Sequence, residues 1–384
     1  MRVAVVSRCA RTLYVFRRGL ILGAIAEGAE VTAIGADGDG FDRNLREAQI
    51  HFEPAPIRFS GLTPLSDLRL IFDLAQRFRR GRVDVCHAFT IKPAIFATLA
   101  ARMAQVPVRV VTITGLGYAF TSATGVLRRL VEWLYRCALG QAHIVFFQNP
   151  EDRRLFVERG LVSEGKTELV PGSGVDARRF VPVPLPCASG GAPVFLMIAR
   201  LLRDKGVLEY CAAARQLRRH CPGARCLLLG GEDPRNPSRL TPQELAQLKA
   251  SPEIELLGEV DDVRPIISRA DVVVLPSYRE GLPRSLLEGG AMGRALIATD
   301  VPGCSEVVQH ERNGLIVPRA DAESFARAMV RLCENPSLIA SYGSTARTDI
   351  ETRFDEQKVI DNTLATYRRL FQENAKGRSE TAAR

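Results

Sequence analysis

Short apolar runs rich in β-branched residues alternate with helical segments along nearly the whole chain, and this alternation constrains the fold more than any other feature. The expected strands of the first half are residues 3–7, 30–35, 83–87, 108–113, 142–147 and 168–170. Those of the second half are residues 193–198, 224–229, 254–257, 270–276, 295–298 and 313–317. Strands separated by helices pair in parallel, because each helix returns the chain to the same end of the sheet. The sequence therefore predicts an α/β fold with parallel sheets.

The helices expected between these strands are residues 16–27, 65–79, 93–104, 126–139, 150–159, 207–220, 241–250, 321–334, 336–347 and 354–371. Residues 8–14 are expected to form a loop, and the tail from Glu373 to be disordered. One Pro/Gly-rich stretch, residues 181–192, is the expected linker. A chain of 384 residues is long enough for two domains, each with its own core. Two similar halves joined by one linker imply a cleft between them.

Charge and cysteine usage narrow the function classes. Residues 1–180 carry 25 Lys and Arg against 17 Asp and Glu, whereas residues 181–384 carry 27 against 26. A basic half suits anionic lipid headgroups, pyrophosphates or nucleic acid, although arginine-rich composition alone also explains it. Nine scattered cysteines without a C-x-x-C pair favour neither a zinc site nor disulfides, so a reducing compartment is expected. No apolar run is long enough to span a membrane, and residues 3–6 are too few for a signal peptide.

Two glutamates, Glu280 and Glu288, stand eight positions apart after the expected strand at 270–276. A Gly-Leu-Pro turn and the start of a helix separate them. Open α/β sheets bind ligands at the carboxyl ends of their strands. A carboxylate ahead of the helix suits a sugar, one inside it suits a ribose, and the helix N-terminus between them favours a diphosphate. For the spacing alone, two solvated surface glutamates are the alternative.

A second cluster follows the expected strand at 193–198. Arg200 and Lys205 stand on either side of a loop that enters a helix, and Gly206 allows a close backbone approach there. Two fixed cations stabilise the charge that develops on a departing diphosphate. Taken alone, the pair has solvated surface cations as its alternative. We expect both clusters at the carboxyl ends of neighbouring strands in one sheet.

Together, the segments IARLLRDKG and REGLPRSLLEGGAMGRALIATDVPG resemble the donor site of the retaining glycosyltransferases of family 4. The resemblance implies that Arg200 and Lys205 bind the donor diphosphate, with Glu280 on the transferred sugar and Glu288 on the ribose. These three residues, Arg200, Lys205 and Glu280, are the catalytic candidates. Backbone groups would complete the donor site, around the nucleobase at Gly258 and Val260 and around the phosphates at Gly281, Leu282 and Pro283.

The resemblance covers nearly the whole chain and implies the GT-B fold, with two Rossmann-like domains facing across a cleft. Their expected bounds are residues 1–182 for acceptor binding and 192–353 for donor binding, with the helix at 354–371 packing back on the first domain. A UDP-sugar, UDP-N-acetylhexosamine or UDP-hexose, is the implied co-substrate, and no cofactor is expected. No D-x-D motif follows a strand, and Asp261-Asp262 falls at the base pocket, so we expect metal independence.

The run from residue 87 to 121 resembles bacterial transferases that elongate sugars linked to polyprenyl diphosphate. Two positions depart from the pattern of many family members: Phe89 replaces a histidine, and Thr114-Gly115 replaces His-Gly. The implied acceptor is a saccharide on undecaprenyl diphosphate, in surface polysaccharide or glycan assembly. His87 faces the ligand or is a core histidine, and both readings stay open. The candidates for the acceptor or sugar pocket are Arg8, Tyr14, Arg17, His87, Lys92, Thr114 and Gly115.

The expected helix at 126–139 carries an apolar stripe with arginines beside it. The stripe is formed by Leu127, Leu130, Val131, Leu134 and Ala138. With Trp133 and Tyr135 at a headgroup interface, this helix would attach a cytoplasmic protein to the inner face of the cell membrane. A helix facing the protein core explains the stripe equally well.

Three other classes of protein explain fewer of these sequence features. A nucleotide-sugar epimerase shares the two-domain layout, but it would release no UDP in transfer. A non-catalytic or nucleic-acid-binding module could use the basic half, but no nucleic-acid motif is present and no nucleic-acid partner is expected. An oxidoreductase is disfavoured because no G-x-G-x-x-G follows residues 3–7.

Overall fold

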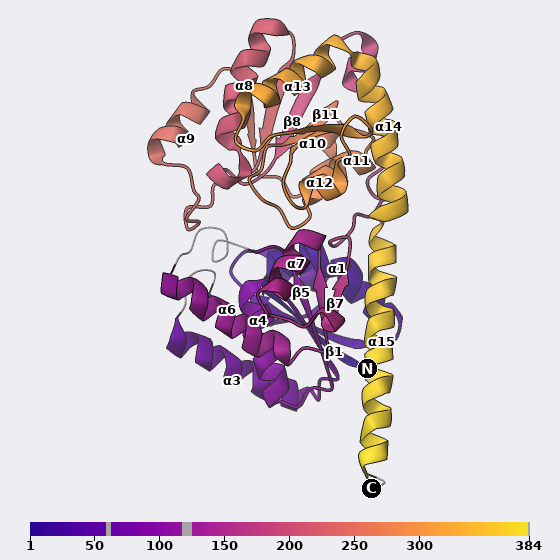
Figure 1. Cartoon of the computed structure of the whole chain (residues 1–384). Helices are drawn as coiled ribbons and strands as arrows, with labels where there is room; N and C mark the ends of the chain where they lie inside the picture. The colour runs from indigo at the N-terminus through magenta and orange to yellow at the C-terminus, as the bar shows by residue number, and fades with distance from the viewer. Residues whose placement is uncertain (59–62, 117–124, 383–384) are drawn as a thin grey trace. The chain divides into compact units, whose positions relative to one another are not determined.

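The computed structural model describes residues 1–58, 63–116 and 125–382, which form two compact units (Figure 1). Unit 1 comprises Met1–Ser173 and Gln357–Arg384, and unit 2 comprises Gly174–Glu356. The chain therefore passes between the units ahead of the expected linker at 181–192, which lies inside unit 2. There the Cys187 N–H donates to Asp271 Oδ1 at 2.9 Å. Residues 117–121, the end of the run that resembles polyprenyl-diphosphate-dependent enzymes, lie outside the described residues.

Unit 1 is built on a seven-stranded sheet in the order β3-β2-β1-β4-β5-β6-β7, within the residues that the structure describes. Its strands are β1 Arg2–Cys9, β2 Glu30–Ala36, β3 His51–Pro54, β4 Val85–Phe89, β5 Val108–Ile113, β6 Ile144–Phe147 and β7 Thr167–Leu169. All neighbours pair in parallel. Each crossover places a helix on one face of the sheet, so the carboxyl ends of all these strands share one edge.

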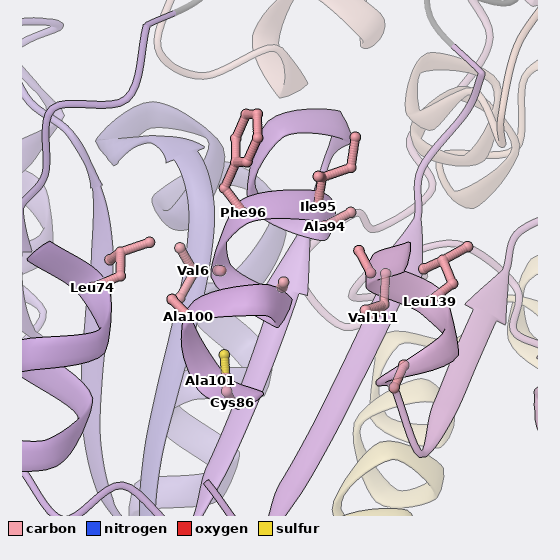
Figure 2. Packing of buried hydrophobic residues seen from close by; sticks show 14 of the residues in the cluster. Val6, Leu74, Cys86, Ala94, Ile95, Phe96, Ala100, Ala101, Val111 and Leu139 are labelled. Carbon is pink, nitrogen blue, oxygen red and sulfur yellow. The ribbon is translucent and has the colours of Figure 1, made fainter. Parts of the chain in front are cut away.

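Helices cover both faces of this sheet, because successive strand residues point to opposite sides. Ala4 and Val6 pack with α3 (Pro64–Arg80), α4 (Ile91–Met103) and α6 (Gly125–Gly140). Figure 2 shows this core, with Leu74 of α3, Ala100 of α4 and Leu139 of α6 directed at the strands. Val3 and Val5 pack on the other side, with α1 (Ala10–Ala26), α2 (Phe41–Glu47) and α15 (Glu356–Ala382). Within the described residues of unit 1, the remaining helices are α7 (Pro150–Glu158) and the 3-10 turn η1 (Glu164–Lys166).

Two expectations for unit 1 are wrong, and two short elements were not predicted. Residues 8–14 form no loop, because β1 runs to Cys9 and α1 begins at Ala10, where the Thr12 hydroxyl accepts from the Cys9 N–H at 3.1 Å. The short elements α2 and β3 had no apolar periodicity long enough to predict them. The tail after Glu373 is helical to Ala382, where it continues α15.

Unit 2 repeats the same plan with a six-stranded parallel sheet in the order β10-β9-β8-β11-β12-β13, again within the described residues. Its strands are β8 Val194–Ile198, β9 Arg225–Leu229, β10 Ile254–Gly258, β11 Val272–Leu275, β12 Ala295–Thr299 and β13 Gly314–Val317. The order reverses between β8 and β11, and such a switch point is where open α/β sheets bind ligands.

The helices of unit 2 lie on both faces of this sheet around two apolar cores. They are α8 Val207–His220, α9 Pro242–Lys249, α10 Arg264–Ile267, α11 Arg284–Ala291, α12 Cys304–Val307, α13 Ala322–Glu334 and α14 Pro336–Arg353, with 3-10 turns η2 Pro186–Ser189 and η3 Arg203–Lys205. The helix expected at 336–347 is longer than predicted, and α15 begins only at Glu356. Across the described parts of the chain, no helix is both long and apolar enough to cross a bilayer.

Candidate active site

The two clusters of unit 2 follow the two strands at the switch point of the sheet. β8 leads into Arg200 and Lys205, and β11 leads into the turn that carries Glu280. β8 and β11 are paired in parallel, with Leu196 opposite Val273. The prediction that both clusters follow neighbouring strands of one sheet is therefore confirmed.

Gly206 brings these two loops into contact. Its φ is +74°, and a Cβ there would lie 2.0 Å from the Pro276 carbonyl oxygen. The contact continues where the Tyr278 N–H donates to the Asp204 carbonyl at 2.8 Å. Any residue with a side chain would force the loops apart, so the glycine fixes the position of Lys205 relative to the turn after β11.

Lys205 and Glu280 form the centre of this site. Lys205 Nζ lies 2.6 Å from Glu280 Oε1, and their side chains are 20% and 12% exposed. The same oxygen accepts from the Ser277 hydroxyl at 2.6 Å. Sequence reasoning missed Ser277, although its place directly after β11 was a usable signal. A half-buried cation beside a carboxylate is suited to an anionic ligand that carries hydroxyl groups.

Arg200 is engaged elsewhere in unit 2. Its Nη1 lies 2.5 Å from Asp233 Oδ2, and its side chain is 46% exposed. Asp233 follows the Gly230-Gly231 turn at the end of β9, and nothing in its spacing predicts the pairing. The structure thus brings Lys205 and Glu280 into contact and holds Arg200 on an acidic side chain of the neighbouring loop.

Glu288 lies inside α11 and is 8% exposed. Arg284, one turn earlier, places its Nε 2.7 Å from Glu288 Oε1. Burial raises the pKa of Glu288 above its ordinary value, while the positive charges of Arg284 and Arg179 oppose that rise. Sequence reasoning missed both arginines, although the four-residue spacing of Arg284 and Glu288 on a helix predicts a side-chain pair.

The backbone positions expected around the donor lie at the ends of two strands. Gly258 ends β10 with φ +70°, and its carbonyl accepts from the Gly230 N–H at 2.8 Å. Val260 follows it and is 37% exposed. Pro283 precedes the first turn of α11, where Gly281 and Pro283 are buried and Leu282 is half-buried. No group of three or more His, Cys, Asp or Glu residues suited to a metal ion occurs among the residues that the structure describes.

In unit 1, His87 lies within the sheet and is 1% exposed. Its Nδ1 lies 2.5 Å from the Tyr367 hydroxyl oxygen, and its Nε2 lies 2.7 Å from Thr112 Oγ1. The imidazole stacks on Phe89 with ring centroids 3.9 Å apart. Burial holds the pKa of His87 well below its ordinary value, and the charge of Arg17 adds to this effect. These contacts favour the core-histidine alternative.

The other acceptor candidates lie near the carboxyl edge of the same sheet, and several are engaged inside unit 1. Arg17 is 8% exposed and stacks over Phe89 at 4.0 Å. Lys92 Nζ pairs with Asp67 Oδ1 at 2.8 Å. The Tyr14 hydroxyl oxygen accepts from Arg18 Nη1 at 3.1 Å. Arg8 lies near the end of β1, and Thr114 and Gly115 follow β5.

The apolar stripe predicted on α6 divides between two faces of the helix. Val131 and Ala138 of the stripe are buried in the core. Tyr135, expected at a headgroup interface, is buried as well, so that expectation is wrong. Leu127 and Leu130 are 46% and 42% exposed, together with Trp133 at 55%. The core-facing alternative is therefore correct for one face, while the other face presents apolar side chains to the surroundings.

Both halves of the chain match models of glycosyltransferase domains. Residues 14–173 match a family model described as "Glycosyl transferase 4-like domain", and residues 192–335 match one described as "Glycosyl transferases group 1". The chain is 27% identical to an N,N'-diacetylbacillosaminyl-diphospho-undecaprenol alpha-1,3-N-acetylgalactosaminyltransferase of Campylobacter jejuni, over 97% of this chain and all of that one. It is 25% identical to a UDP-Gal:alpha-D-GlcNAc-diphosphoundecaprenol alpha-1,3-galactosyltransferase of Escherichia coli, over 81% and 82%.

Solved structures show the same fold. Anabaena HepE in complex with UDP superimposes with a TM-score of 0.75 at 19% identity, over 95% of this chain and 99% of that one. The sucrose-phosphate synthase of Thermosynechococcus elongatus gives a TM-score of 0.80 at 20% identity, over 97% and 100%. The two parallel-sheet units therefore have the GT-B architecture, and the predicted fold class is confirmed.

Proposed function

We propose that this chain, which belongs to the glycosyltransferases built from a 4-like and a group 1 domain, moves a sugar from a UDP-sugar to a saccharide on polyprenyl diphosphate. The transferred unit is an N-acetylhexosamine or a hexose. The observation that carries the proposal is the contact of Lys205 with Glu280, made by loops of adjacent strands at the switch point. The similarity to enzymes named for undecaprenyl-diphosphate-linked acceptors supports the acceptor class.

On the donor side, a diphosphate draws Lys205 and Arg200 from their carboxylate partners and is stabilised by both cations. Glu280 then accepts from hydroxyls of the sugar, and Glu288 from those of the ribose. The bond between the anomeric carbon and the diphosphate oxygen breaks, and UDP leaves with the electron pair. An acceptor hydroxyl attacks from the same face and gives its proton to a phosphate oxygen, so the configuration is retained. Lys205 and Arg200 supply the counter-charge, so the transfer needs no metal ion.

On the acceptor side, the basic first half of the chain supplies the charge for a lipid-linked diphosphate. Residues 1–180 carry 25 Lys and Arg against 17 Asp and Glu. The residues proposed to contact it are Arg8, Tyr14, Arg17, Lys92, Thr114 and Gly115. Because undecaprenyl carriers reside in a bilayer, we place the protein at the cytoplasmic face of the membrane, attached peripherally.

The test is a screen of UDP-sugars by thermal shift, followed by transfer to polyprenyl-diphosphate-linked saccharides. We expect one UDP-sugar to stabilise the protein, UDP to be released only when acceptor is present, and NMR to show the donor's anomeric configuration in the product. Release of an epimerised free sugar without acceptor would instead establish the epimerase alternative. Transfer that stops with EDTA and returns with a divalent ion would refute metal independence.

A further inference from the structure

Exposed apolar side chains of unit 1 gather on two helices, α3 and α6. Leu65 of α3 and Val126 of α6 are 86% and 82% exposed. Each helix also presents a large aromatic side chain, Phe72 at 56% and Trp133 at 55%. Single exposed apolar residues are ordinary on a protein surface, but a set that includes two aromatics on two helices that both pack on α4 marks an interaction surface.

The spacing shows that each helix is apolar on two faces. On α3, the outward residues recur at intervals of three and four positions, and they are Leu65, Leu68 and Phe72. On α6, the outward residues follow the same rule, and they are Val126, Leu130 and Trp133. The opposite faces bury Leu70 and Leu74 of α3 and Val131 and Tyr135 of α6. Because the inner faces form the core, the exposed parts of the outer apolar residues are available for another contact.

Among the described residues, the two helices carry paired carboxylates and exposed, unpaired arginines. Each carboxylate of α3 and α6 is held by a cation: Asp67 by Lys92, Asp73 by Arg77, and Glu132 by Arg128 and Arg159. The outward faces instead carry Arg69 and Arg129, which are exposed and make no ion pair with any residue that the structure describes. The outward surface is thus apolar and cationic, with no exposed carboxylate. That combination matches the headgroup region of an anionic bilayer.

The surface also lies at the carboxyl ends of the strands of unit 1, where the proposed function places the acceptor. β3 and β5 precede α3 and α6, so both helices begin at the carboxyl edge of the sheet, as does α4 after β4. Both helices pack on α4, on one side of the sheet (Figure 1). The two most exposed apolar residues, Leu65 and Val126, lie in the first turns, at the same edge as Arg8 and Thr114.

We propose that the α3–α6 surface, formed by Leu65, Leu68, Arg69, Phe72, Val126, Arg129, Leu130 and Trp133, docks into a bilayer that contains anionic phospholipid. This inference rests on the proposed function and names the part of unit 1 that meets the membrane. Docking places the carboxyl edge of the sheet at the bilayer surface, where a lipid-linked diphosphate emerges. The first turns insert apolar side chains, and Arg69 and Arg129 pair with phosphates.

The test is sedimentation of the full chain with vesicles of phosphatidylglycerol and phosphatidylcholine, compared with phosphatidylcholine alone. Wild type should bind the anionic vesicles at low salt and release as salt rises. Replacing Leu65, Phe72, Val126 and Trp133 together by Gln should weaken partitioning at least about tenfold. Arg69→Gln with Arg129→Gln should weaken binding to anionic vesicles alone. Each substituted side chain is exposed, so thermal unfolding should be unchanged.

Matched controls come from unit 2. Val181→Gln with Val183→Gln removes two exposed apolar side chains, and Arg215→Gln with Arg219→Gln removes two exposed helix charges. Both controls should bind vesicles as wild type does. Equal loss in the controls, or wild-type binding by the α3–α6 variants, would overturn the proposal. Self-association of wild type that the apolar variant abolishes, without any vesicle binding, would assign the surface to a second copy of the chain.

A transfer assay separates this inference from the proposed function. With a short, water-soluble polyprenyl-diphosphate sugar, the α3–α6 variants should retain wild-type rates. With a long-chain acceptor embedded in vesicles, their rates should fall at least about tenfold. Wild type that transfers to neither acceptor but still sediments through this surface would refute the proposed function and leave the docking surface supported.

Discussion

The two units have sheets of the same topology, so the switch point of unit 2 corresponds to the carboxyl ends of the central strands of unit 1. The polar residues near these two positions differ in their burial and in their contacts. In unit 2, Glu280 contacts Lys205 of the facing loop and the buried Ser277, and the side chains of Lys205 and Glu280 remain partly exposed. In unit 1, His87 and Arg17 are buried, with the imidazole bonded to Tyr367 and Thr112. The same topology thus supports a charged site in one unit and a closed polar core in the other.

This difference separates the residues that we assign to ligand binding from those that stabilise the fold. A cation and a carboxylate held together at the carboxyl ends of adjacent strands are typical of a ligand-binding site, so we assign Lys205 and Glu280 to ligand binding. A fully buried histidine with both nitrogens bonded contributes to the packing of unit 1, because an unpaired polar group there is costly. Substitutions in unit 2 should therefore change activity, and substitutions around His87 should change stability.

Lys205→Ala should have the largest effect on activity. Removing a cation that stabilises a departing diphosphate should lower kcat by about 10²-fold or more. Because the two side chains are only 20% and 12% exposed, losing the pair should also lower stability, so denaturant unfolding is measured beside kcat. The control is Lys249→Ala, which removes an exposed pair with Glu232 on α9. Near-normal turnover of the Lys205 variant would break the assignment of the donor site.

Glu288→Ala should weaken nucleotide binding more than it changes the chemical step. A lost pair of charge-assisted hydrogen bonds to ribose hydroxyls corresponds to about tenfold or more in Kd. Calorimetry with UDP measures this directly, and Glu334→Ala at the end of α13 is the matched control. An unchanged UDP affinity would remove Glu288 from the ribose site and leave it as a buried partner of Arg284.

Tyr367→Phe should lower the free energy of unfolding by about 1–3 kcal/mol, because it leaves His87 Nδ1 buried without its partner. Denaturant unfolding measures this effect, and kcat with a soluble acceptor should stay near wild type. Tyr14→Phe, at a half-buried hydroxyl, is the control for stability. A large fall in kcat with unchanged stability would instead place His87 and Tyr367 in the acceptor site.

The pKa of His87 adds a pH dependence to the same comparison. Because burial holds the folded-state pKa well below the ordinary value, His87 is neutral in the folded protein. Its contribution to stability is then fully present above the unfolded pKa of about 6.5 and is lost as the pH falls towards the folded value. Unfolding curves at pH about 7.5 and about 5.5 should show a smaller loss of stability for His87→Gln than for wild type.

The sequence predicted much of this, for identifiable reasons. Strands such as β5 and helices such as α8 have a strong apolar periodicity and were placed with matching bounds. Residues 8–14 were misassigned because arginines and Tyr14 on a half-exposed helix resemble a polar loop. The bonds of His87 to Tyr367 and of Arg200 to Asp233 join residues far apart in the chain, and neither residue's neighbours carry a signal for its partner. Local patterns therefore predict elements and motifs, whereas long-range polar pairing requires the folded structure.

The smallest expected effect is the change in UDP affinity on substitution of Arg284. Its pH dependence shows whether Arg284 acts on the nucleotide through Glu288. Arg284 lies 2.7 Å from Glu288, and its charge opposes the rise in the carboxyl pKa that burial causes. In Arg284→Gln that pKa should rise further, so a larger fraction of Glu288 is protonated as the pH falls. UDP affinity of the variant should match wild type at pH about 8 and become progressively weaker than wild type as the pH falls from there. Calorimetry across that range measures it, with Arg284→Lys restoring the wild-type profile. A loss of affinity independent of pH would mean that Arg284 contacts the nucleotide itself, which would extend the donor site by one cation.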